Sequence, residues 1–121
     1  MAESKNFKSD LIPGISTGFC GGVSRTCGIC GAVSGAIMAL GIRYGRNNPD
    51  ESTARCYEAV QGFVKAFENK FGSTNCQQLT GCDLGTEEGR EKFNSGNVIQ
   101  KCREFTEEAT SLAMSIIEEK S

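Results

Sequence analysis

Apolar side chains recur at spacings of three and four residues in two long parts of the chain. The first set lies directly before Gly72 and consists of Cys56, Val60, Phe63, Phe67 and Phe71. This spacing predicts an amphipathic helix, and glycine is a typical residue after a last helical turn. Residues 47–51 combine asparagine, proline and two acids, so we expect the helix to begin there.

The second set predicts a last helix over about residues 96–119. Charged residues such as Glu107, Glu108 and Lys120 lie off its apolar stripe, as in a helix that buries one face. The stripe consists of Val98, Cys102, Phe105, Ala109, Leu112 and Ile116.

Three further segments have helical features. Residues 30–44 carry apolar groups on nearly every helical face, which predicts a helix buried on all sides. Asn75 followed by Gln78 is typical of a capped helix start, and Gly81 of its end. Thr86, followed by two glutamates, predicts the start of one or two more turns.

No segment shows the alternation of apolar and polar residues that is typical of a strand. We therefore expect an all-α protein, a small bundle of about four helices with a glycine- and cysteine-rich loop. Residues 1–18 are polar and contain a Pro13-Gly14 turn signal, so we interpret them as an N-terminal arm. We expect residues 19–121 to form a single cysteine-rich helical domain.

The composition of the chain excludes several classes of function. The 121 residues suffice for one domain, but Leu, Ile, Val and Phe number only 25, so the core is expected to be thin. The formal net charge of −2 leaves no basic excess for general nucleic-acid binding. Histidine is absent, which excludes His–Asp triads, HExxH zinc sites and histidine general bases.

The N-terminus has no apolar core of a secretory signal. The most apolar stretch, residues 29–42, is shorter than a membrane span of about 20 residues and contains three glycines. We therefore expect a cytoplasmic protein without a membrane span. Disulfide frameworks are rare in that compartment, and the seven cysteines are an odd number, so metal binding or redox chemistry is the expected role of the thiols.

Three cysteines lie within eleven residues of a glycine-rich stretch, residues 18–31: Cys20, Cys27 and Cys30. Two thiolates three residues apart can reach one metal or cluster, and a glycine backbone lets a third join them. We expect Cys30 in the first turn of the following helix, where the helix dipole favours a thiolate. Arg25 and Arg43 would add positive potential.

The other cysteines divide between function and packing. Cys76 and Cys82 flank the short helix expected at residues 75–81 and are open to either role. Cys102 lies on the apolar stripe of the last helix, where a free cysteine is often a small buried hydrophobe. Cys56 lies beside phenylalanines on a similar stripe, and we assign it to packing.

Four motifs stand out along the chain: CGAVSGAIMALG at residues 30–41, YGR at 44–46, FGSTNC at 71–76 and KC at 101–102. Together they resemble the C-GCAxxG-C-C family, whose members are inferred to be redox-active from their cysteines. The resemblance covers roughly residues 17–115 and implies a small α-helical domain. It extends to the non-haem iron domain of split-Soret cytochromes, which implies an iron–sulfur role.

The resemblance implies that Cys30, Cys76 and Cys102 are the family cysteines. The family usually begins with a cysteine-bearing helix of NCAQA type, and nothing before Cys20 matches it. Either Cys20 or Cys27 can take the place of the missing ligand.

The leading hypothesis is an iron–sulfur protein that carries electrons to or from a redox partner protein. Four thiolates are the usual ligands of such clusters. We expect these to be Cys27, Cys30, Cys76 and Cys102, with Cys20 and Cys82 as the first substitutes.

Three alternatives stay open. A thiol–disulfide oxidoreductase would use Cys27 and Cys30, although the βαβ context of such motifs is missing. Four cysteines could instead hold a structural zinc ion, with zinc replacing the iron–sulfur cluster as the cofactor. The chain could also be a helical interaction module. Because the core is thin, and both the helix at 30–44 and the last helix have apolar surface to cover, we expect a homodimer.

Overall fold

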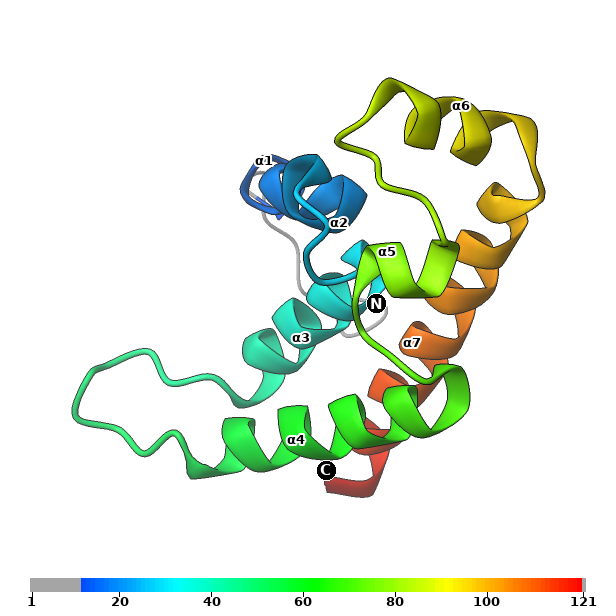
Figure 1. The fold of residues 1–121 in the computed structure, drawn as a ribbon. Helices are drawn as coiled ribbons and strands as arrows, with labels where there is room; N and C mark the ends of the chain where they lie inside the picture. The colour runs from blue at the N-terminus through cyan, green and yellow to red at the C-terminus, as the bar shows by residue number, and fades with distance from the viewer. Residues whose placement is uncertain (1–11, 121) are drawn as a thin grey trace.

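The computed structural model describes residues 12–120, and the surroundings of side chains are described for residues 14–118. Within this part the chain is helical and contains no strand, which confirms the all-α class (Figure 1). The expected number of about four helices is too low, because short helices precede α3 and connect α4 to α7. The elements are α1 (Ile12–Ser16), the 3-10 turn η2 (Thr17–Phe19), α2 (Cys20–Arg25), α3 (Gly31–Tyr44), α4 (Ala54–Phe71), α5 (Cys76–Thr80), α6 (Glu87–Ser95) and α7 (Val98–Lys120).

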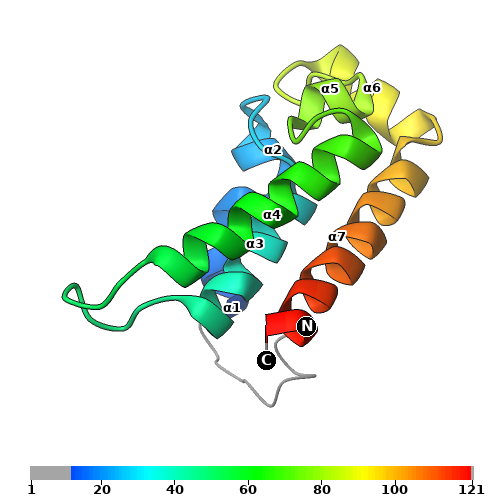
Figure 2. The ribbon, with the colours of Figure 1, turned by 90° about the horizontal axis from the view of Figure 1, so that it is seen from below.

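Three long helices form the body of the molecule. Helix α3 packs against both α4 and α7, and α4 also packs against α7. Helices α2, α5 and α6 gather at one end of this three-helix body, where α3 begins, α4 ends and α7 begins (Figures 1 and 2). The chain segments that carry most cysteines therefore meet at that end.

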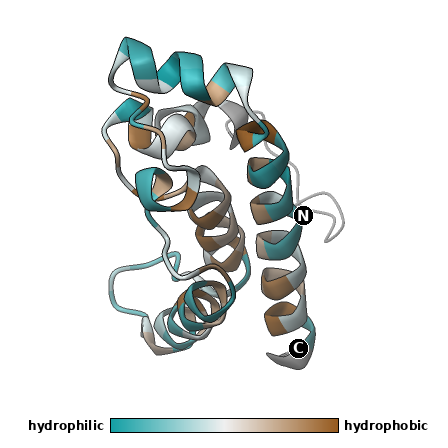
Figure 3. Cartoon of the chain, turned by 45° about the vertical axis from the view of Figure 1, so that its right-hand side comes forward, coloured by the Kyte–Doolittle hydropathy of each residue, from teal (hydrophilic) through white to brown (hydrophobic). Residues whose placement is uncertain are grey.

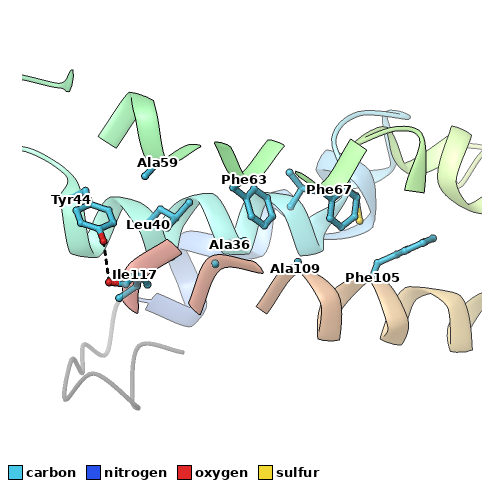
Figure 4. Close-up of a cluster of buried hydrophobic side chains, with 12 residues drawn as sticks. Ala36, Leu40, Tyr44, Ala59, Phe63, Phe67, Phe105, Ala109 and Ile117 are labelled. Atoms are coloured by element: carbon cyan, nitrogen blue, oxygen red, sulfur yellow. Dashed lines mark hydrogen bonds between the residues drawn. The ribbon is translucent and has the colours of Figure 1, made fainter. Parts of the chain in front are cut away.

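Apolar side chains fill the space between the three long helices (Figure 4), and the hydrophilic faces of α4 and α7 point outward (Figure 3). Phe63 and Phe67 of α4 are fully buried, and the ring of Phe67 lies 6.3 Å from that of Phe105 on α7. At the opposite end of the body, the Tyr44 hydroxyl donates a hydrogen bond of 3.3 Å to the carbonyl oxygen of Ile117. Burial of these side chains supplies the main stabilisation of the fold.

Four predicted helix ends are confirmed. Gly72 and Gly81 have φ values of 87° and 72°, and their N–H groups donate to carbonyls of the preceding turns. The Asn75 side chain accepts from the N–H of Gln78, and the Thr86 side chain accepts from that of Gly89. Local turn chemistry therefore decides these boundaries.

The predicted start of α4 at residues 47–51 is wrong, because α4 begins at Ala54. The Asn48 side chain accepts from the N–H of Asp50, which makes a local turn in place of a helix cap. The Arg46 side chain donates to the carbonyl oxygen of Pro49, which an early helical turn would need for itself.

The arm predicted for residues 1–18 lies largely outside the described residues. Its described part contains α1 and the first two residues of η2. In the part of the chain that the structure covers, no helix combines the length and the apolar character needed to cross a membrane.

Candidate functional site

Six of the seven cysteines lie in the segments that meet at the end formed by α2, α5 and the first turns of α7 (Figure 1). Cys56 is the exception, because it lies near the start of α4 and packs against the apolar core. Its assignment to packing therefore agrees with its position. All seven thiols are free. We call Cys27, Cys30, Cys76, Cys82 and Cys102 the thiol end.

Backbone hydrogen bonds join the two main cysteine segments. The N–H of Cys30 donates to the carbonyl oxygen of Thr74 over 2.7 Å, and the N–H of Cys76 donates to that of Gly28 over 2.8 Å. These bonds form an isolated antiparallel bridge between Ile29 and Asn75. The Asn75 side chain also donates to the carbonyl oxygen of Cys27 over 2.6 Å. Asn75 thus caps α5 and fixes the loop that carries Cys27.

Helix α2 covers Cys76 with a left-handed turn. Gly21, Gly22, Val23 and Ser24 all have φ values between 54° and 64°, which costs a residue with a Cβ about 1–2 kcal/mol. Gly22 is buried, and a Cβ added to it would lie 2.5 Å from the Cβ of Cys76. The glycine therefore permits a backbone-to-side-chain approach that no other residue allows.

Burial and neighbouring thiols raise the pKa values of Cys76 and Cys102. Burial raises the pKa of Cys102 to about 11, with further contributions from the charges of Cys30, Cys76 and Cys82. Burial also raises the pKa of Cys76, followed by the charge of Cys30; Thr80 opposes this shift through a hydrogen bond. We call Cys30, Cys76, Cys82 and Cys102 the four-thiol group.

Cys27 lies at the margin of this group. Its thiol donates a hydrogen bond of 3.1 Å to Oδ1 of Asp83. That hydrogen bond raises the pKa of Cys27 most, followed by desolvation, the charge of Asp83 and the charge of Cys76. The environment therefore favours a neutral Cys27 thiol, which is a poor nucleophile.

The sequence-based assignments agree with this geometry only in part. Cys30 is the residue before α3 and not in its first turn. Cys82, expected as a substitute ligand, is 2% exposed and belongs to the four-thiol group, whereas Cys20, the other substitute, is exposed. Arg25 stays near the glycine-rich turn, but Arg43 lies at the far end of α3, over the Tyr44 ring.

Sequence reasoning missed three residues of the site. Asp83 follows Cys82 directly, and an acid beside a cysteine is a visible signal. Gly22 had no separate signal among the glycines around it. Ser34 lies one helical turn after Cys30, and its hydroxyl is buried without a hydrogen-bond partner among the described residues.

The thiols can supply the ligand atoms of a metal centre, since Cys30, Cys76, Cys82 and Cys102 lie in segments that meet at one end of the molecule. As they stand, however, no three His, Cys, Asp or Glu side chains in the described part of the chain are close enough together to hold a metal ion. Metal binding therefore requires the thiol side chains to turn toward a common centre.

The comparisons with known proteins agree with the cysteine pattern. A family model described as "Putative redox-active protein (C_GCAxxG_C_C)" matches residues 1–116. An uncharacterized protein of Archaeoglobus fulgidus is 29% identical over 129 residues, which covers 98% of this chain and 80% of that protein. No solved structure matches the chain. The family resemblance found in the motifs is thus confirmed.

Proposed function

We propose a function from the premise that this chain belongs to the C_GCAxxG_C_C family of redox-active proteins. In our proposal the protein carries electrons on an iron–sulfur cluster held by the four-thiol group. The observation that carries the proposal is that the segments of Cys30, Cys76, Cys82 and Cys102 meet at one end of the molecule, where the first three of these side chains are buried.

The charges within the group support a bound cation. Burial raises the cost of ionising Cys76 and Cys102 most, and the charges of Cys30 and Cys82 add to that cost. An iron–sulfur cluster offsets this cost, because it replaces the thiol protons with positively charged iron and takes four cysteine ligands. When bound, such a cluster supplies a one-electron redox centre, which needs no histidine acid or base.

The chain's own residues support this function in three ways. The glycine-rich turn and the 29–75 bridge hold Cys30 and Cys76 on neighbouring segments. The Ser34 hydroxyl can donate a hydrogen bond to the thiolate of Cys30 or to a sulfide, which stabilises the added negative charge. Burial of Cys76 and Cys82 shields the site from water.

The test is anaerobic purification with sufficient iron, followed by a visible spectrum and analysis of iron, acid-labile sulfide and zinc. We expect iron and sulfide with charge-transfer absorption. A folded protein that stays colourless and metal-free after reconstitution contradicts the proposal. One equivalent of zinc without sulfide supports the structural zinc site.

Cysteine-to-serine variants identify the ligands. Serine at Cys30, Cys76, Cys82 or Cys102 is expected to remove or change the cofactor, and serine at Cys56 to leave it intact. The two possible ligand sets differ in one cysteine: the set expected from the sequence contains Cys27, whereas the four-thiol group contains Cys82. Loss of iron in Cys27→Ser together with full iron in Cys82→Ser favours the set that contains Cys27.

A second candidate is a thiol–disulfide redox protein that uses Cys27 and Cys30. It is favoured by the fact that, in the described region, no three potential ligand side chains lie close enough together to hold a metal ion. It is opposed by the hydrogen bond to Asp83, which raises the pKa of Cys27. A reversible mass difference of one disulfide between Cys27 and Cys30, in protein without iron, supports this candidate.

The partner and location remain proposals as well. We propose a redox partner protein, a cytoplasmic location and a homodimer. The argument for a dimer from the apolar surface of α7 is weakened, because Phe105, Ala109 and Ile117 are buried inside a single chain. The argument from the apolar surface of α3 is retained, since Ile42 is 40% exposed. Light scattering of the reduced protein decides between monomer and dimer.

A further inference from the structure

A cavity of about 560 Å³ lies between the left-handed turn of α2 and helix α6, outside the four-thiol group. Both helices are at the same end of the molecule (Figure 1). The polar residues that line it include Ser24, Arg25, Arg90 and Asn94, and the cavity also contains the Cys20 side chain. Its volume suits a small molecule.

The charges of the lining select an anion. Two arginines line the cavity, and none of the lining residues carries a carboxylate, although the chain as a whole has a net charge of −2. Within the described residues neither arginine is in an ion pair. Arg90 is held in place because its guanidinium donates a hydrogen bond of 3.0 Å to the carbonyl oxygen of Leu84. Arginine binds carboxylates through paired hydrogen bonds.

The cavity also contains a reactive group. The Cys20 thiol is exposed and lines the cavity together with the arginines, whereas Cys30, Cys76 and Cys82 are buried. The Phe93 and Leu84 side chains supply an apolar wall for the carbon chain of a ligand. When the arginines bind the carboxylates of a ligand, the Cys20 thiol in the same cavity can contact a sulfur atom of that ligand.

We infer that this cavity binds a small disulfide with carboxylate groups, which Arg25 and Arg90 hold while its sulfur meets Cys20. The Cys20 thiol loses its proton, and its sulfur attacks one sulfur of the disulfide. An S–S bond to Cys20 forms, the original S–S bond breaks, and its electron pair leaves with the other half of the ligand. That half takes up a proton and becomes a free thiol. Cys20 is thereby oxidised, and the departing half is reduced.

The cavity is independent of the proposed cluster but adjoins it. Gly21 lines the cavity, and the next residue, Gly22, packs directly on Cys76. The inference goes beyond the proposed function, and its test separates the two. Cys20→Ser is expected to abolish adduct formation while iron and sulfide content stay unchanged.

The test compares three small disulfides of similar length on the reduced full chain. These are 3,3′-dithiodipropionate, which carries two carboxylates, neutral 2-hydroxyethyl disulfide and cationic cystamine. Mass spectrometry of peptides measures the rate of adduct formation at Cys20. We expect the dianion to react at least about tenfold faster than the neutral compound, and cystamine to react slowest. The advantage of the dianion should decrease as salt is added.

Variants assign the selectivity to the cavity. Arg25→Gln is expected to bring the rate of the dianion close to that of the neutral disulfide, and Arg25→Lys to restore part of the difference. Arg43→Gln, which removes an exposed arginine at the far end of α3, is the matched control and should change nothing. Equal rates for the three disulfides in the unmodified chain overturn the inference without any variant. So does an adduct that forms first on another cysteine.

Discussion

The three-helix body and the thiol end are held together by different forces. In the body, side chains of α3, α4 and α7 pack on one another, and the Phe67 ring lies 4.8 Å from that of Phe71. At the thiol end, hydrogen bonds link short segments, and a left-handed turn at Gly22 replaces a regular helix. The body is therefore stabilised by buried area, whereas the thiol end depends on a few specific backbone positions.

This difference separates stability from function. Loss of a ring in the body removes buried apolar area and weakens the whole fold cooperatively. A change at the thiol end alters the positions of sulfur atoms and costs less free energy of unfolding. The comparison predicts that stability and cofactor content can be changed independently.

The largest effect on stability is expected for Phe67→Ala. The side chain is fully buried and contacts three other phenylalanine rings, so its removal should lower the free energy of unfolding by about 3–5 kcal/mol. Urea denaturation measures the change. Tyr57→Ala, at a 61% exposed position, is the control and should stay within about 0.5 kcal/mol. A loss at Phe67 no larger than the control contradicts the role of the body.

Gly22→Ala is expected to affect cofactor content more than stability, in contrast to Phe67→Ala. The added Cβ meets Cys76 at 2.5 Å in a left-handed backbone, so the cost should be about 1–3 kcal/mol, with a large loss of bound iron. Gly35→Ala is the matched control, because Gly35 is exposed within α3 and its Cβ would meet nothing within 4 Å. There we expect no loss of iron. Full iron content in Gly22→Ala would show that the turn does not position Cys76.

The same comparison explains what the sequence could predict. The body follows helical periodicity, so Phe63, Phe67, Phe105 and Ala109 were placed correctly on buried faces. Helix ends that depend on one residue, such as Gly72, were also predicted. The start of α4 was missed because a side chain, Arg46, competes for the carbonyl of Pro49.

The thiol end could be predicted only as a set of cysteines. The grouping of Cys82 with Cys30 depends on where α5 lies relative to α3, and no local pattern encodes that. The left-handed φ values of Val23 and Ser24 could not be inferred either, because neither residue favours them. Tertiary contacts across many residues therefore decide the site.

A smaller effect is expected from pH in the reduced, metal-free protein. The pKa of Cys102 is raised from 9.0 to about 11. The contribution of the neutral Cys102 thiol to the free energy of unfolding is therefore complete below pH 9 and is lost as the pH rises toward 11. The loss should be about 1 kcal/mol, since the side chain is partly exposed. Denaturation between pH 8 and 11 measures it. Cys102→Ala should show a flatter pH dependence, and an identical slope contradicts this assignment.

The smallest effect is expected for Asp83→Asn. The asparagine keeps an acceptor for the N–H of Gly85. It replaces the carboxylate whose hydrogen bond, and to a smaller extent whose charge, raises the pKa of Cys27. The pH midpoint for alkylation of Cys27 by iodoacetamide should therefore move to lower pH, with little change in the denaturation midpoint. Glu87→Gln, which removes an exposed acid nearby, should leave the Cys27 midpoint in place. An unchanged midpoint in Asp83→Asn shows that the carboxylate does not control this thiol.

The bridge between Ile29 and Asn75 has a consequence for the order of folding. It joins segments that are separated by all of α3 and all of α4, so the chain must close a long loop before the bridge can form. Cys102 is added later still, on α7, which leaves the ribosome after α5. A nascent chain that ends before α7 therefore exposes its earlier thiols without the thiol of Cys102. We expect cofactor insertion to follow the synthesis of α7 and not to precede it.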